Sequence, residues 1–289
     1  MALLPITVTC NQRCLFCSAY GRDDGARAAG ALRELEKMAA AGADSVALSG
    51  GETTFSPALA RIVAFARKKG LKVELQTNAL TSCYPAKAAW LAGLGADLFN
   101  VNFPSHQAAV NDRLTGTKGT LPLRLAGVRN LIKSGANVRL THLITALTYR
   151  KLPEFVAYAA EKMPGMSYIQ FSFIKGVGLA AHNAWLAPEY ALVSPYLTKA
   201  LALCGKLGLE AVVDHIPPCF LGRFYRLHID FIKLAAGRDT AVSESEKRKL
   251  PACAGCALER RCFGPRTDHA EMLKGSKLVR PLKKLPRGG

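Results

Sequence analysis

The first 175 residues alternate short apolar segments with amphipathic ones, and this alternation restricts the fold more than any other feature of the chain. Runs with the length of strands are separated by segments whose apolar residues recur at helical spacing. Helices that follow buried strands in this way imply a parallel sheet with helices on its outer face. The expected strands cover residues 6–9, 44–49, 71–77, 97–103, 136–145 and 167–174, and the expected helices cover 26–41, 57–70, 85–94, 120–134 and 152–163.

Six such units without a Gly-x-Gly-x-x-Gly at the first turn argue against a dinucleotide-binding sheet. We therefore predict an α/β fold in which residues 1–185 form a partial (β/α)6 TIM-like barrel. Beyond residue 185 the pattern loosens into a helix (188–205), a short strand (209–213) and a polar linker (239–249). Residues 186–289 are predicted to form a small, cysteine-rich C-terminal domain with a basic tail.

Charge and cysteine content limit the classes of function. The 289 residues carry 39 Lys and Arg against 21 Asp and Glu, a net charge of +18, with six cations and no acid after Glu271. Such a surface attracts nucleic acid, acidic peptides or phosphorylated substrates, or is simply solvated around a frayed tail. No membrane span and no signal peptide are expected. A cytoplasmic location would keep the nine cysteines reduced, which favours metal-binding or catalytic roles.

Three cysteines follow the first expected strand, in the sequence C-N-Q-R-C-L-F-C: Cys10, Cys14 and Cys17. Three thiolates on one loop can converge on one metal centre, and a tetrahedral zinc ion or a four-cysteine cluster would need a fourth ligand. Because none is nearby, the spacing indicates a 4Fe-4S cluster with one iron left open. Zinc with a distant ligand, or three core cysteines, are the alternatives.

Further candidate residues also follow the ends of expected strands. Gly50 and Gly51 let a backbone come close to a ligand, and Glu52 suits an ammonium group. Buried polar side chains need partners, which marks Asn78, Asn102, Ser105 and Thr141. Turn capping or a satisfied inward hydroxyl is the alternative explanation for the last group. Parallel barrels carry their chemistry at this rim. His142 should point to the opposite face from Thr141 and have a structural role.

A second set of cysteines comprises Cys253, Cys256 and Cys262, with Cys219 upstream. By spacing alone, four thiolates suit a structural zinc ion or a complete 4Fe-4S cluster equally well. Cys219 follows two prolines at an expected helix start, a position that lowers the pKa of a thiol. Cys83 and Cys204 are predicted to lie outside both sites, with Cys204 on an apolar helix face.

The C-x3-C-x2-C spacing directly after a first strand resembles the signature of the radical S-adenosylmethionine (SAM) superfamily, and the resemblance extends over residues 4–175. It implies that SAM chelates the open iron, that Phe16 lies against the adenine, and that Gly50-Gly51-Glu52 holds the amino group. Thr53 stands where proline is usual. The remaining SAM contacts implied by the resemblance are Asn78, Asn102, Ser105, Thr141 and Ile169.

The C-x2-C-x5-C run of Cys253, Cys256 and Cys262 resembles the auxiliary-cluster extensions called SPASM and twitch domains. The full SPASM pattern has another cysteine four residues later, where this chain has Arg266. The resemblance therefore implies one auxiliary 4Fe-4S cluster, with Cys219 as its fourth ligand.

These resemblances imply an enzyme that cleaves SAM reductively to a 5′-deoxyadenosyl radical, which takes a hydrogen atom from a substrate. The electron would come from a donor such as flavodoxin or ferredoxin. Residues 101–119 resemble peptide maturases, so a ribosomal peptide or protein is the expected substrate. Because the cluster loop begins at residue 10, a separate protein would have to supply peptide recognition, or the substrate is not a leader peptide. RNA, a small anionic metabolite and a non-enzymatic, metal-bearing nucleic-acid-binding protein are the alternatives.

Overall fold

The structure is a computed structural model that describes residues 2–20, 28–238 and 240–286. The chain divides into two compact units that interleave along the sequence. Unit 1 comprises residues 1–14, 19–141 and 162–167, and unit 2 comprises residues 15–18, 142–161 and 168–289. The boundary after residue 185, between barrel and C-terminal extension, stays a prediction.

Seven strands form the sheet, in the order β1-β2-β3-β4-β5-β6-β7. The pairings of β1 with β2, β2 with β3, β3 with β4, β4 with β5, and β6 with β7 are all parallel. The α/β class and the parallel sheet are thereby confirmed. The strands are β1 (Ala2–Thr7), β2 (Ser45–Gly50), β3 (Lys72–Thr77), β4 (Leu98–Asn102), β5 (Val138–Ile144), β6 (Tyr168–Phe173) and β7 (Glu210–Asp214).

Two features of the sheet correct the prediction. The first strand begins at Ala2 and ends at Thr7, whereas residues 6–9 were expected; its register to β2 shifts between Pro5 and Thr7, and the regular ladder ends there. The segment 209–213, expected outside a six-stranded barrel, is β7. It pairs with β6 from Tyr168 to Ser172 and gives the sheet a seventh strand.

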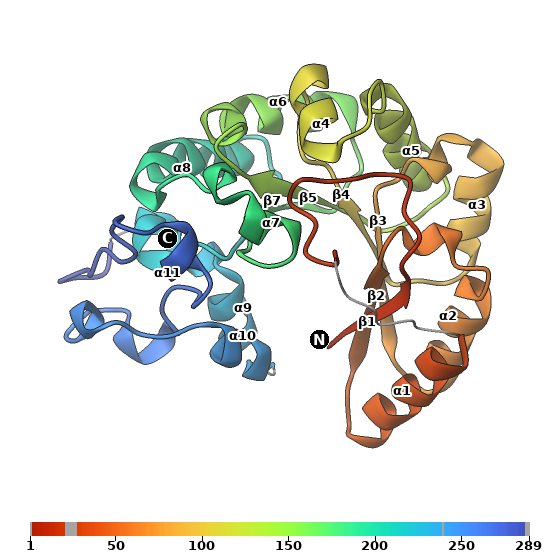
Figure 1. Cartoon of the computed structure of the whole chain (residues 1–289), viewed down its shortest axis with the longest axis horizontal. Coiled ribbons are helices and arrows are strands. Elements are labelled where there is room, and N and C mark those ends of the chain that lie inside the picture. Colours follow the sequence, from red (N-terminus) through yellow and green to blue (C-terminus); the bar gives the residue numbers. More distant parts are fainter. Residues whose placement is uncertain (1, 21–27, 239, 287–289) are drawn as a thin grey trace. The chain divides into compact units, whose positions relative to one another are not determined.

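The helices alternate with the strands as predicted over the first part of the chain. In α2 the buried residues Leu59, Ile62, Val63 and Ala66 form one apolar stripe. The helix begins at Leu59 rather than Pro57. Figure 1 shows α1, α2 and α3 along one side of strands β1 to β4. The helices are α1 (Ala28–Ala40), α2 (Leu59–Lys68), α3 (Pro85–Gly93), α4 (Ala108–Thr115), α5 (Leu121–Lys133), α6 (Leu152–Lys162), α7 (Leu179–His182), α8 (Tyr190–Lys206), α9 (Ile229–Ala235), α10 (Ala241–Glu246) and α11 (His269–Met272).

Helices α4 and α10 were among those not anticipated, and one expected helix is described only in part. Residues 26–27 of the expected helix 26–41 lie outside the described residues. The expected linker 239–249 contains α10, with Ser243 buried; residue 239 lies outside the described residues. Helix α4 lies in a segment without a clear apolar stripe and ends at Gly116, whose φ of 62° suits glycine. No described helix is long and apolar enough to cross a membrane.

Candidate functional site

The loop that follows β1 carries Cys10, which is exposed, and Cys14, which is half-buried; both belong to unit 1. All three residues between these cysteines are anchored to other elements of unit 1. Asn11 Oδ1 accepts a 2.7 Å hydrogen bond from Asn78 Nδ2, at the end of β3. The amide of Arg13 donates to the carbonyl of Thr115, at 3.0 Å, at the end of α4. Hydrogen bonds to the residues between Cys10 and Cys14 therefore fix the conformation of this part of the loop.

The third anchor is Arg124 of α5, which is fully buried. Its Nη2 donates to Gln12 Oε1 at 2.9 Å, its Nε donates to the carbonyl of Asn78 at 3.2 Å, and its Nη1 donates to Asn111 Oδ1. Burial lowers the pKa of Arg124 to about 10, and the negative charges of Cys14 and Glu52 act in the opposite direction. The guanidinium thus stays charged at neutral pH and joins α4, α5, β3 and the cysteine loop.

Gly50 and Gly51 pack directly against the segment that leads into this loop. A Cβ at Gly50 would lie 2.3 Å from the carbonyl oxygen of Thr7, and one at Gly51 would lie 2.3 Å from that of Thr9. The amides of Gly51 and Glu52 donate to the same two carbonyls, at 2.7 and 2.8 Å. Glycine is required here because two backbones touch, a reason that differs from the ligand approach inferred from the sequence.

The Glu52 carboxylate is buried, with 1% of its surface exposed. Its Oε1 accepts hydrogen bonds from the amide of Thr54, from Thr54 Oγ1 and from Thr77 Oγ1, and its Oε2 accepts one from the amide of Asn78 at 2.7 Å. Thr53, in the position where proline is usual, donates to the carbonyl of Gln76 at 2.6 Å. The carboxylate therefore fastens the Gly-Gly-Glu turn to the end of β3.

The remaining predicted contacts lie at or near strand ends. Asn102 ends β4 and is half-buried, and no partner for its side chain is found within the described part of the chain. Ser105 Oγ accepts from the amide of Gln107, the turn-capping role named as an alternative. Thr141 donates to Asn100 Oδ1 at 2.6 Å. Ile169, in unit 2, is fully buried in β6.

One face of strands β3 to β5 carries polar residues that the sequence analysis missed. The registers Gln76↔Asn100 and Asn100↔Arg139 place these side chains on one face. Glu74 is buried and forms an ion pair with Arg139 at 2.7 Å, and it also accepts from Asn100 Nδ2. The signal was present, because polar residues recur at every second position of these strands.

Cys17 belongs to unit 2, together with Phe16, which is half-buried. The carbonyl of Cys17 accepts from the amide of Leu179 at 2.9 Å, and that of Leu15 accepts from Asn183 Nδ2 at 3.2 Å. Gly178 lies so close that a Cβ there would be 2.3 Å from the Cys17 carbonyl oxygen. The segment after β6 was not expected to hold this part of the loop.

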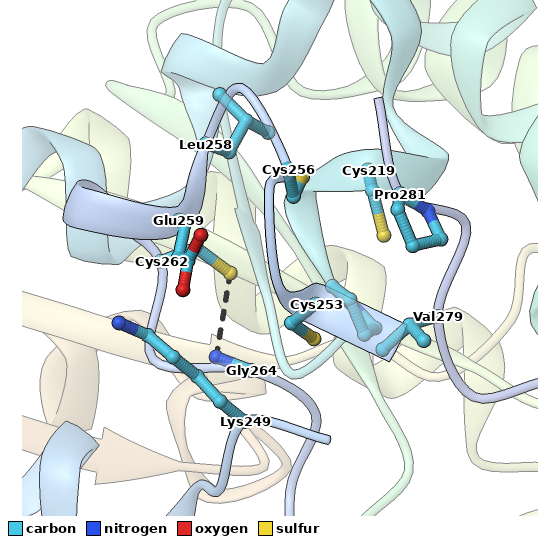
Figure 2. Close-up of a pocket in the computed structure, with 11 residues that line it drawn as sticks. Cys219, Lys249, Cys253, Cys256, Leu258, Glu259, Cys262, Gly264, Val279 and Pro281 are labelled. Atoms are coloured by element: carbon cyan, nitrogen blue, oxygen red, sulfur yellow. Dashed lines mark hydrogen bonds between the residues drawn. The ribbon is translucent and has the colours of Figure 1, made fainter. Parts of the chain in front are cut away.

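The other predicted cysteines share one pocket of unit 2. Cys219, Cys253, Cys256 and Cys262 line about 360 Å³ of empty space, counting the part open to solvent. Figure 2 shows the four sulfurs around this space, with Val279 and Pro281 on one side. Burial raises the pKa of the Cys219 thiol to about 12. The lowering expected at a helix start is therefore wrong: burial disfavours the thiolate, and the helix there, Pro218–Phe220, has only three residues.

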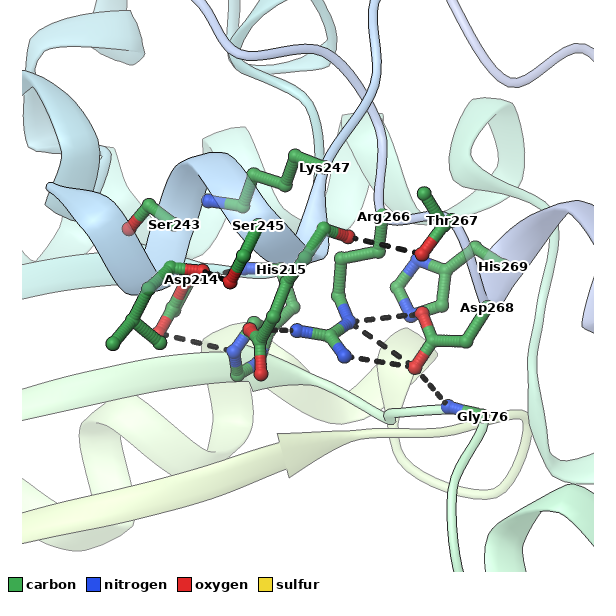
Figure 3. Close-up of polar contacts among 12 residues, drawn as sticks. Gly176, Asp214, His215, Ser243, Ser245, Lys247, Arg266, Thr267, Asp268 and His269 are labelled. Carbon is green, nitrogen blue, oxygen red and sulfur yellow. Dashed lines mark hydrogen bonds and ion pairs between the residues drawn. The ribbon is translucent and has the colours of Figure 1, made fainter. Parts of the chain in front are cut away.

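Arg266 occupies the position of a further SPASM cysteine, and it is buried in an ion-pair network. Its guanidinium pairs with Asp268 at 2.8 Å and with Glu246. Asp268 also accepts from the amide of Gly176 at 3.0 Å, as Figure 3 shows. The position of the further cysteine is thus taken by an arginine that forms ion pairs with Asp268 and Glu246. The prediction of a single auxiliary site is compatible with that arrangement.

A family model described as the radical SAM superfamily matches residues 4–159, more than half of the chain. The chain belongs to the radical SAM superfamily. It is an enzyme of this family, and membership implies a 4Fe-4S cluster and SAM as cofactors.

Curated relatives in this family have different activities. The chain is 27% identical to Fe-coproporphyrin III synthase of Methanosarcina barkeri over 168 residues, 56% of this chain and 42% of that protein. It is 30% identical to PqqA peptide cyclase of Gluconobacter oxydans over 185 residues, 64% of this chain and 50% of that protein. The chain thus spans about half the length of the curated relatives it matches.

Solved structures support the radical SAM fold along nearly the whole chain. Streptococcus suis SuiB bound to precursor peptide SuiA matches with a TM-score of 0.66 and 15% identity, over 98% of this chain and 74% of that one. Native anSMEcpe with bound AdoMet and Kp18Cys peptide matches with a TM-score of 0.64 and 13% identity, over 98% and 93%. At these identities the likeness shows the fold.

The cysteine loop has donors that fit the family's cofactors. Gln12 Nε2 is buried, and no hydrogen-bond partner for it occurs in the described ranges 2–20, 28–238 and 240–286. An orphaned amide N–H between Cys10 and Cys14 suits an acceptor such as a cluster sulfur or a SAM oxygen. Outside the loop, the half-buried Asn102 side chain offers a second such group.

The residues that were expected to lie outside both cysteine sites have the predicted surroundings. Cys204 is buried on α8, and Cys83 lies in the short helix Thr81–Cys83. His142 stacks on Phe155 of α6 with ring centroids 3.8 Å apart, as expected for a structural role.

Proposed function

We propose that this radical SAM enzyme binds a 4Fe-4S cluster through Cys10, Cys14 and Cys17, cleaves SAM there, and abstracts a hydrogen atom from a ribosomal peptide or protein. The observation that carries the first part is the anchoring of Asn11, Gln12 and Arg13 by three separate elements. The loop is thereby fixed through its spacer residues, and it presents Cys10 exposed and Cys14 half-buried. An electron donor such as flavodoxin or ferredoxin would supply the electron.

The residues of this chain would bind and orient the cofactors. When bound, the reduced cluster and SAM supply a one-electron cleavage that gives methionine and a 5′-deoxyadenosyl radical. Asn78 and Arg124 hold the cysteine loop, and Glu52 holds the turn beside it. Asn102, whose side chain has no partner among the residues that the structure describes, offers its amide at the end of β4, the rim at which parallel barrels bind their ligands. The buried polar face around Glu74 and Arg139 provides groups for orienting a substrate.

We also propose an auxiliary 4Fe-4S cluster at Cys219, Cys253, Cys256 and Cys262. Four thiols beside the apolar side chains of Leu258, Val279 and Pro281 suit such a cluster. No three His, Cys, Asp or Glu side chains in the described part of the chain are gathered closely enough to ligate one metal ion. By their chemistry four thiols suit a structural zinc ion or a complete cluster, and the resemblance to auxiliary-cluster extensions favours the cluster.

The peptide substrate is supported by the relatives. One relative is a PqqA peptide cyclase, and the SuiB and anSMEcpe structures were solved with bound peptides. A second candidate is a small anionic metabolite, because a coproporphyrin synthase is among the curated relatives and this chain carries a net charge of +18.

The direct test is anaerobic reconstitution with iron and sulfide, reduction with dithionite, and detection of 5′-deoxyadenosine by mass spectrometry. Wild-type protein should form it slowly without substrate, and Cys14→Ala should not. No product from a reduced, cluster-loaded wild-type protein would refute the SAM-cleaving function. A panel of acidic precursor-like peptides and a tetracarboxylate porphyrin then separates the substrate classes, because the true class should accelerate 5′-deoxyadenosine formation.

A further inference from the structure

The C-terminal segment Val279–Leu282, termed the strap, runs along the pocket of the four cysteines. Val279 and Pro281 line this pocket, as Figure 2 shows. The amide of Arg280 donates to Cys219 Sγ at 3.3 Å, and the amide of Leu282 donates to Cys256 Sγ at 3.3 Å. The sequence analysis allowed a frayed, solvated tail, but this part of it is ordered by contacts to two cysteine sulfurs.

Two further contacts fix the strap in place. The carbonyl of Leu282 accepts a 2.7 Å hydrogen bond from the amide of Ala257, so Leu282 is bound through its carbonyl as well as through its amide. The Leu282 side chain packs against the buried cluster of Tyr225, Phe231 and Leu258. Because the Arg280 side chain is exposed, its contribution to the pocket is made by the backbone.

The strap's composition fits this arrangement. Pro281 has no amide N–H to donate, so the donors come from the residues on either side of it while its ring lines the pocket. A third amide, that of Gly264, donates to Cys262 Sγ at 3.3 Å. Three of the four cysteine sulfurs thus accept an amide N–H, and two of these donors belong to the strap.

We propose that the strap is part of the auxiliary site: it closes the pocket and stabilises the negative charge on the sulfurs of Cys219 and Cys256. This inference rests on the proposed auxiliary cluster. Amide donors to cluster sulfurs, together with exclusion of solvent, set the reduction potential. Four protein ligands under a strap leave no open iron. We therefore infer that the auxiliary cluster serves electron transfer or stability and does not bind substrate.

The test compares Arg280→Pro with Arg280→Ala, which lose the same side-chain charge and differ in the amide N–H. Both are made in the full chain with Cys10, Cys14 and Cys17 replaced by alanine, so that one cluster contributes to the signal. The midpoint potential is read by redox titration with electron paramagnetic resonance. We expect Arg280→Pro to be more negative than Arg280→Ala by about 59 mV, a tenfold change in the one-electron ratio of oxidised to reduced cluster.

A wild-type measurement guards against misfolding of the proline variant. Hydrogen exchange of the peptide covering residues 277–286 should slow at least tenfold when the full chain is loaded with its clusters. Equal potentials for the two variants, or equal exchange in loaded and unloaded protein, would overturn the strap and leave the auxiliary cluster standing. Absence of iron from the Cys10/Cys14/Cys17→Ala background would overturn both.

Discussion

The two cysteine sites are held in opposite ways. At the N-terminal loop, hydrogen bonds engage the spacer residues Asn11 and Gln12, and Cys10 is exposed. At the C-terminal pocket, backbone amides contact the sulfurs of Cys219, Cys256 and Cys262 themselves. A site built to admit a further ligand needs a rigid frame and accessible sulfurs, whereas a site built to transfer electrons needs enclosed ones. On the proposed function, these two tasks would fall to different regions of one chain.

The largest effect should come from removing each set of cysteines. Reconstituted wild-type protein should hold about eight irons, four for each 4Fe-4S cluster. Alanine at Cys10, Cys14 and Cys17 should leave about four and abolish 5′-deoxyadenosine. Alanine at Cys253, Cys256 and Cys262 should also leave about four but retain slow SAM cleavage. Iron analysis and mass spectrometry check both; loss of SAM cleavage in the second variant would contradict the division of tasks.

Variants of Arg124 test whether the first cysteine site depends on the hydrogen bonds that anchor its loop. Arg124→Met should lower the free energy of unfolding by about 3–5 kcal/mol, because it leaves buried partners such as Gln12 and Asn111 without a donor. Arg124→Lys keeps the charge but loses the planar fork, so it should recover part of this loss. Urea unfolding of the iron-free protein measures the stability.

A readout specific to the loop accompanies the Arg124 variants. Amides of residues 11–14 should exchange faster in Arg124→Met, while residues 277–286 should be unaffected. If the loop amides exchanged at the wild-type rate, Arg124 would not position the loop.

Glu52 should have an intermediate effect. Glu52→Ala should weaken SAM binding by about 1.5–3 kcal/mol, the scale of a lost charge-assisted hydrogen bond in a buried site. The carboxylate accepts four hydrogen bonds from its own chain, so stability should also fall. Isothermal titration with SAM on cluster-loaded protein separates these effects when unfolding is measured in parallel. Thr81→Ala, a change next to this network, should leave SAM affinity nearly unchanged.

Acid should weaken unit 2 through its buried histidines. Burial lowers the pKa of His269 to about 4, from an ordinary value of 6.5. The unfolded chain therefore binds more protons between pH 6.5 and 4, and stability falls as pH falls through that window. His269→Gln should reduce the loss between pH 7 and pH 5 by on the order of 1–2 kcal/mol. Urea unfolding at the two pH values gives the difference; an unchanged difference would exclude His269 as its source.

The smallest expected effect concerns the basic tail. Changing Lys277, Lys283 and Lys284 to serine spares the strap but removes three charges. With a peptide substrate, tRNA binding at 200 mM salt should be weak and change less than about twofold. An RNA substrate would instead give steep salt dependence that flattens in the variant, by roughly 0.7 in log–log slope for each lost phosphate contact. Filter binding at two salt concentrations distinguishes these outcomes.

Most of the fold could be predicted because strand and helix periods are local properties of the sequence. The buried stripe of α2 and the apolar run of β2 are readable from their own residues. By contrast, β7 could not be assigned to the sheet from its five residues, because pairing with β6 depends on contacts about 40 residues away. The alternation within β3 to β5 is readable from the sequence, but the pairing of Glu74 with Arg139 and Asn100 depends on neighbouring strands.

The candidate site could be predicted in its cysteines but not in its supports. Motif spacing points to Cys10, Cys14 and Cys17, whereas nothing in the sequence links Arg124 to a loop 112 residues earlier. One arginine on the buried side of α5, beside Gly127 and Val128, was the available hint. The contacts of the strap could not be predicted for another reason. They are made by backbone amides, which every residue except proline has, so the side chains give little indication of them apart from Pro281.

The strap also determines when each site can be assembled during synthesis. The supports of Cys10 and Cys14 are complete once residue 124 has been made, because Asn78, Thr115 and Arg124 all precede the rest of the chain. The second pocket requires Leu282. Chains fold from the N-terminus as they leave the ribosome. A nascent chain can thus hold Cys10 and Cys14 in place first, and the contacts to Leu15 and Cys17 follow once residues 178–183 have been made. The pocket of the four later cysteines closes last, after the strap has emerged.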